Sequence, residues 1–122
     1  MNESAIRDLL STCDLLLTDP ALTLTPAGRH RSASFALRTA LELAIDDRLK
    51  SSLPGLGRIP MRARLLCLRS FTDPRTARRA RSVWSHLCLG CHYHQYEMGP
   101  SADQVRSWRA EVAGLVEALQ PR

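Results

Sequence analysis

Apolar residues recur at intervals of three and four along most of this chain, and prolines separate the segments in which they do so. This spacing places apolar side chains on one face of an α-helix, so it predicts helices rather than strands. Because helices with one apolar face bury that face against one another, the pattern predicts an all-α bundle. The clearest stripe lies near the C-terminus and consists of Val105, Trp108, Val112, Leu115, Val116 and Leu119.

We expect four main helices and one short helix, joined by turns that contain proline. The predicted helices span about 3–17, 26–50, 60–71, 74 to 93–96, and 101–119. The connection 51–60 holds two prolines and two glycines. We interpret it as a turn, because neither side of it is long enough to bury a core alone. The sequence therefore predicts a single domain over residues 1–122, an up-and-down helical bundle.

Three of the predicted helix starts carry capping signals. Thr25 and Asp73 each stand directly before a proline, which is typical of an N-cap followed by the first helical position. Ser101 and Gln104 have the spacing of a capping box, in which each side chain accepts a hydrogen bond from the other residue's free backbone amide. Local chemistry thus indicates where these helices begin.

Positive charge is concentrated in one part of the chain. The net charge is +5, and residues 58–81 contain eight arginines and one aspartate, whereas the flanking parts together hold nine basic and eleven acidic residues. Arginine forks match phosphate oxygens, so the cluster suits phosphate or another anionic surface. The alternative is that these arginines lie on solvated helix faces and bind nothing.

The composition also bears on the compartment. No run of about 18 apolar residues is present, so we expect no membrane span. The N-terminal residues have acids where a signal peptide needs a basic end, and we expect a cytoplasmic protein. The four cysteines are then predicted to be reduced thiols rather than disulfides. Their positions are Cys13, Cys67, Cys88 and Cys91.

The segment 75–98 holds most of the residues with chemical potential, including three of the four histidines. Cys88, Cys91 and His92 match the attachment motif of c-type haem, but haem attachment needs export, so we expect no cofactor. The same residues together with His94 could bind zinc, because cysteine and histidine are its usual ligands. The alternative is that Cys88 and Cys91 are core thiols on an apolar stripe.

Arg81 is followed five positions later by His86, with Ser82 directly after the arginine. In this spacing, and in the order of its predicted helices, the chain resembles the HEPN superfamily, whose members are small helical bundles found in bacterial toxins, defence systems and ribonucleases. The family's histidine usually lies close to the turn before the last helix, where His92 stands. Both His86 and His92 are therefore candidates for the family's histidine.

The resemblance implies a homodimer that binds RNA or cleaves it without a metal. Arg81 would stabilise the charged phosphorus and the histidine would move protons, while Arg75, Arg78 and Arg79 would guide RNA toward them. It also implies a toxin or defence role with an antitoxin as a possible protein partner. Two alternatives remain open: a non-catalytic dimerising bundle that docks a protein partner, and a small zinc-binding regulatory domain.

Overall fold

The computed structural model describes residues 2–91 and 99–121, and this part of the chain contains helices but no strands. The predicted all-α bundle of four main helices and one short helix is confirmed. The helices are α1 (Glu3–Thr18), α2 (Pro26–Ser52), α3 (Met61–Leu68), α4 (Pro74–Cys91) and α5 (Ala102–Ala118). The fourth helix was predicted to end between residues 93 and 96, which lie outside the described residues.

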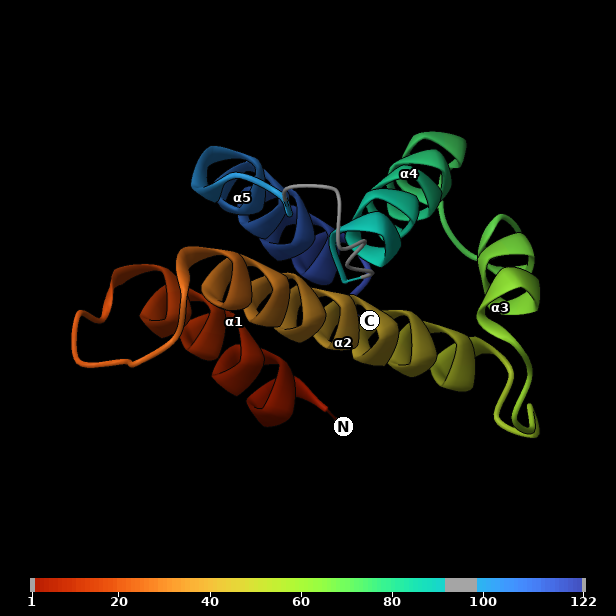
Figure 1. Ribbon diagram of the computed structural model, residues 1–122. Coiled ribbons are helices and arrows are strands. Elements are labelled where there is room, and N and C mark those ends of the chain that lie inside the picture. The colour runs from red at the N-terminus through yellow and green to blue at the C-terminus, as the bar shows by residue number, and fades with distance from the viewer. Residues whose placement is uncertain (1, 92–98, 122) are drawn as a thin grey trace.

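The long helix α2 is the centre of the bundle and contacts all four other helices. Figure 1 shows α1 packed along one side of α2, with α4 and α5 crossing its other side and α3 near its C-terminal end. Small alanines alternate with leucines on its buried face, so neighbouring helices can approach closely. The buried apolar residues of α2 are Ala33, Ala36, Leu37, Ala40, Leu41, Ala44, Ile45 and Leu49.

All three predicted caps are present. The Thr25 hydroxyl accepts a hydrogen bond from the amide three residues on, at 3.0 Å. Asp73 accepts one from the Thr76 amide at 2.9 Å and another from the Thr76 hydroxyl at 2.7 Å. Ser101 and the glutamine three residues later form the complete capping box. These bonds satisfy amides that a helix start otherwise leaves unpaired.

Arginine side chains fasten α3 and the turn after it to α2. Arg64 Nη1 lies 2.7 Å from Asp46 Oδ1 and 3.3 Å from Glu42 Oε1. From α2, the Arg48 guanidinium donates to the Phe71 carbonyl through Nε at 3.1 Å and Nη2 at 2.5 Å. The short helix is therefore held in place by charge-assisted hydrogen bonds as well as by its few buried leucines.

A third arginine ties the start of α2 to the end of α1. Arg29 donates to the Leu16 carbonyl at 3.2 Å and to the Leu22 carbonyl in the connection at 2.8 Å. Carbonyl groups in the last turn of a helix lack partners within the helix, so a guanidinium stabilises them.

The buried face of α4 lies beside Cys88 and Cys91, for which the sequence offered a role as core thiols. Val83, Leu87 and Gly90 are buried, whereas Trp84 and the cysteines at 88 and 91 are half-buried at its margin. The sequence prediction missed Gly90 because glycine adds no apolar side chain to a stripe. Gly90 instead allows neighbouring helices to approach α4 closely.

At Gly90, α4 comes very close to two other helices. A Cβ atom at this position would lie 2.8 Å from Trp108 Cζ3 on α5 and 2.9 Å from Ser34 Oγ on α2. Ser34 is fully buried, and its hydroxyl donates to the His30 carbonyl at 2.9 Å. Only glycine fits this crossing without displacing its neighbours.

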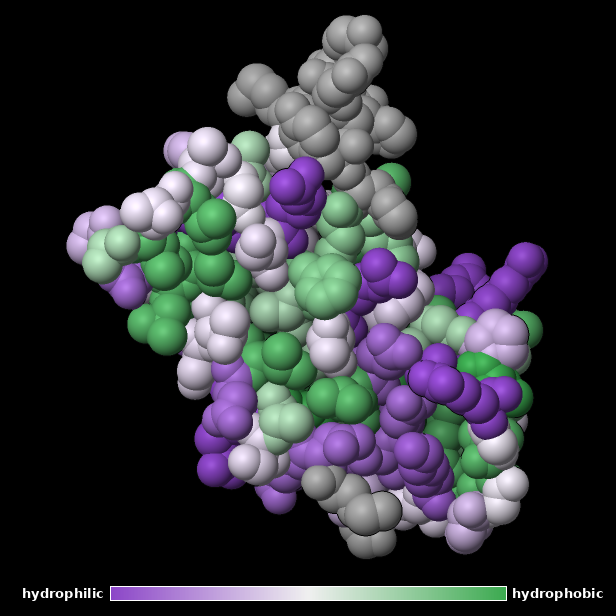
Figure 2. All heavy atoms as spheres, turned by 60° about the horizontal axis from the view of Figure 1, so that its bottom comes forward, coloured by the Kyte–Doolittle hydropathy of each residue, from purple (hydrophilic) through white to green (hydrophobic). Residues whose placement is uncertain are grey.

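The surface divides into two kinds of region. Figure 2 shows the molecule from the side of α1 and α2, with apolar surface over α1 and its connection to α2. Leu15 on α1 and Leu24 in the connection are 57% and 44% exposed. Hydrophilic side chains gather toward the end that carries α3. None of the described helices is both long and apolar enough to cross a membrane.

Candidate nucleic-acid interface

An open groove of about 1080 Å³ separates α3 from α4. Four of its lining residues are arginines, and none is acidic. Leucine, alanine, proline and tryptophan supply the apolar part of the lining, and two serines supply hydroxyls. The lining residues are Arg62, Leu65, Leu66, Arg69, Ser70, Pro74, Ala77, Arg78, Arg81, Trp84 and Ser85.

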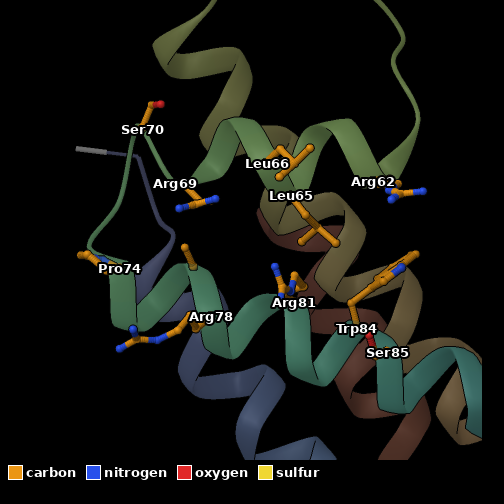
Figure 3. Close-up of a pocket in the computed structure, with 11 residues that line it drawn as sticks. Arg62, Leu65, Leu66, Arg69, Ser70, Pro74, Arg78, Arg81, Trp84 and Ser85 are labelled. Carbon is orange, nitrogen blue, oxygen red and sulfur yellow. The ribbon is translucent and has the colours of Figure 1, made fainter.

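Each wall of the groove presents two arginines because of their spacing along its helix. Arg62 on α3 lies four residues before Leu66, and Arg69, the C-cap of α3, lies three residues after it, which places all three on one face. On α4, Arg78 and Arg81 are three residues apart and also share a face. Figure 3 shows Arg69 and Arg81 extending from opposite helices into the space between them.

No carboxylate of the described residues neutralises the groove arginines. The side chains of Arg62, Arg69, Arg78 and Arg81 have no hydrogen-bond or ion-pair partner among the described residues. Elsewhere the chain does pair its arginines with carboxylates, as in the two-bond contact between Arg109 and Asp14 at 3.0 Å. Four unpaired cations facing one concave surface produce a positive potential that favours anions.

The floor of the groove is apolar. Leu65 is buried there. Leu66, on the α3 wall beside the floor, is 53% exposed. Trp84 is half-buried, and its ring closes one end of the groove. The Cζ atom of Arg38 on α2 lies 4.9 Å from the centroid of this ring. This cation–π contact fixes the ring, and Arg38 does not itself line the groove.

The residues predicted to bind RNA divide between three environments. Arg78 lines the groove, as does Arg81. Arg75 is exposed but does not line it. Arg79 faces α5, where its Nη2 lies 3.2 Å from Glu111 Oε2. Arg62 and Arg69 were not predicted as site residues, because their place opposite α4 depends on how the short helix packs.

The structure does not bring Arg81 and His86 together within one protomer. Five positions separate them on α4, and at about 100° per residue their directions differ by about 140°. His86 instead stacks on Trp108 of α5, with ring centroids 6.3 Å apart and ring planes 8° from parallel. His92, the other candidate, lies outside the described residues.

The cysteines do not form a metal site within the described part of the chain. No group of three histidine, cysteine, aspartate or glutamate side chains there could hold a metal ion. Cys88 and Cys91 are half-buried free thiols. Burial raises the pKa of the Cys91 thiol, and a hydrogen bond from Arg38 opposes that rise. The weak zinc alternative also needs His92 and His94, which lie outside the described residues.

Comparison with known proteins adds no relative. No protein-family model, no curated protein and no solved structure matches this chain. The case for a function therefore depends on the groove.

Proposed function

We propose that this protein binds RNA through the groove between α3 and α4. The observation that carries the proposal is that four unpaired arginines and no carboxylate line one open groove, among the residues that the structure describes. Guanidinium groups bind phosphate oxygens in a bidentate manner, and phosphate contacts supply most of the sequence-independent affinity for nucleic acids. The resemblance of the chain to HEPN domains favours RNA over other polyanions.

The geometry supports binding better than cleavage. Metal-independent cleavage of the HEPN kind needs an arginine and a histidine at the same phosphate. Arg81 faces the groove and His86 stacks on α5, so the groove offers phosphate binding without a general acid or base from His86. Membership of the HEPN superfamily stays a prediction, as do the homodimer and the toxin or defence role.

The test is a binding titration of a labelled single-stranded RNA by fluorescence anisotropy over a series of salt concentrations. Each phosphate contact with a single strand contributes about −0.7 to the slope of log K against log salt. Four engaged arginines thus predict a slope of about −3. Arg69→Gln and Arg81→Gln should each weaken binding and reduce the slope by about 0.7.

Arg7→Gln is the matched control. Arg7 is exposed on α1, which contacts α2 and α5 but neither wall of the groove. The control variant has the same change in net charge, so its affinity should stay close to that of the wild type. If Arg7→Gln weakens binding as much as Arg81→Gln, the interaction is diffuse and the groove is not the site. Absence of RNA binding at low salt would reject the proposed function itself.

A further inference from the structure

The groove combines charge and apolar surface in a definite order. Leu66 lies between Arg62 and Arg69 on the α3 wall. Leu65 and Trp84 lie between that wall and the arginines of α4. Phosphate binding alone does not involve an exposed leucine, and Leu66 is 53% exposed to solvent. This arrangement suits a ligand that carries both anionic and apolar groups.

We infer that the apolar lining of the groove is a base-binding subsite, and that the groove accepts unpaired nucleotides in preference to duplex RNA. The inference rests on the proposed function and deepens it. Phosphates of a single strand reach the arginines on the walls, and one or more unstacked bases lie against Leu66 and Trp84. Aromatic side chains and cationic grooves are the usual combination in proteins that bind single strands.

A duplex would fit this groove poorly for a physical reason. Bases in an A-form helix are stacked inside it, and the major groove is too deep and narrow for side chains to read them. A duplex therefore presents phosphates and ribose hydroxyls to the arginines but leaves the leucine and tryptophan surface without a partner. A single strand covers both kinds of surface.

Trp84 is held ready for this contact. The guanidinium of Arg38 lies over its ring, with Cζ 4.9 Å from the centroid. Since Arg38 does not line the groove, the part of the ring that faces the groove is left uncovered by this contact. Fixing the ring before the ligand arrives lowers the entropy lost on binding.

The experiment compares three RNA probes at one salt concentration. The first is a short mixed-sequence single strand, the second is that strand annealed to its complement, and the third is an abasic strand of the same length. The single strand should bind most tightly. Equal affinity for the single strand and the abasic strand would overturn the inference, because bases would then contribute nothing.

Leu66→Gln tests the apolar lining without disturbing the core, since Leu66 is largely exposed. We expect about a fivefold loss of affinity for the single strand, on the scale of a small apolar contact area removed from an interface. Affinity for the abasic strand and the salt slope should not change. Leu15→Gln is the control, because Leu15 is 57% exposed on α1, away from the groove.

The outcomes separate the inference from the proposed function. If Leu66→Gln and Leu15→Gln bind the single strand alike, or if the duplex binds as tightly as the single strand, the base subsite is wrong. The arginine variants would then still decide whether the groove binds RNA. If none of the three probes binds, both the subsite and the proposed function fail.

Discussion

The guanidinium of Arg64 on α3 lies 2.7 Å from the carboxylate of Asp46 on α2, and both side chains are largely shielded from solvent, with exposures of 15% and 25%. Arg64 also donates to the Ile59 carbonyl at 2.9 Å. One side chain thereby connects α3, the connection before it and α2. The position of α3, which forms one wall of the groove, therefore depends on the ion pair between Arg64 and Asp46.

Replacing Arg64 with methionine should lower the free energy of unfolding by about 1–3 kcal/mol, because a partly buried carboxylate loses its charged partner. Urea denaturation followed by circular dichroism measures this. Arg106→Met is the control, since Arg106 and Asp103 form an exposed pair with 58% and 92% side-chain exposure. Such pairs contribute less than about 1 kcal/mol. Equal losses in the two variants would show that Arg64 has no special role.

Gly90→Ala should destabilise the protein by about 1–2 kcal/mol, although alanine is the better helix former. The added methyl group would lie 2.8 Å from Trp108 Cζ3 and 2.9 Å from the hydroxyl of the fully buried Ser34, so these neighbours must shift to accept it. Gly114→Ala is the control, because its nearest neighbour is the flexible end of Arg79 at 3.4 Å. That change should be neutral or stabilising. Differential scanning calorimetry of both variants tests the crossing.

His86→Ala and Arg81→Gln should have different effects on RNA binding. His86 lies off the groove, so its replacement should leave RNA affinity unchanged and reduce stability by less than about 1 kcal/mol through the lost stack on Trp108. Arg81→Gln should weaken RNA binding. The same proteins incubated with RNA in EDTA should leave it intact. Cleavage by the wild type that both substitutions abolish would instead support HEPN-type catalysis.

The Cys13 thiol should be the least reactive of the four. Cys13 is fully buried, and burial raises its pKa to about 11, with Asp14 adding to the rise and Arg109 opposing it. Thiol labelling requires the thiolate, so iodoacetamide at pH 8 should modify Cys88 and Cys67 well before Cys13. Peptide mapping by mass spectrometry shows the order, and early labelling of Cys13 would contradict its burial.

The Cys13 thiol also makes the free energy of unfolding depend on pH in the alkaline range. Its folded pKa of about 11 exceeds the ordinary value of 9.0, so between these values the folded state binds more protons than the unfolded state. The contribution of Cys13 is complete below pH 9 and is lost as the pH rises through about 11. Urea denaturation of the wild type and Cys13→Ala across this pH range measures this contribution. If the free energies of unfolding of the two proteins changed with pH in parallel, the linkage to the Cys13 thiol would be contradicted.

Asp73→Ala should lower the Tm at neutral pH, because α4 loses its N-cap. Hydrogen bonds from the Thr76 hydroxyl and amide lower the pKa of the Asp73 carboxyl below its ordinary value of 3.8. Its stabilising effect is therefore present above that value and is lost as the pH falls through the lowered pKa. Thermal melts at neutral and acidic pH should show the difference between variant and wild type shrinking in acid. A difference in Tm that stayed the same at both pH values would contradict a stabilising role for the ionised Asp73 carboxylate.

Sequence reasoning succeeded where the signal is local. The caps at Thr25, Asp73 and Ser101 depend on residues within one turn, and each is present in the structure. The end of the short helix was predicted too late. α3 ends at Leu68, and the chain then continues to Phe71 through tighter bonds between residues three apart.

The site was predicted only in part, because it depends on how two helices meet. The stretch of positive charge was visible, but Arg79 pairs with Glu111, which lies 32 residues further along the chain. No local pattern reveals such a partner. One signal in the sequence was overlooked: Arg62, Leu66 and Arg69 have the spacing of a single helix face, and that spacing alone indicates a wall that is both cationic and apolar.

The arginines that donate to main-chain carbonyls or pair with α2 have a consequence for how the molecule could be altered. Arg29, Arg48 and Arg64 are committed to architecture, and lysine could not reproduce their forked bonds. The groove arginines carry no such duty among the described residues. The arginines that hold the helices together and those that line the groove are therefore different residues, so the groove arginines can be replaced while the contacts that hold the scaffold stay as they are.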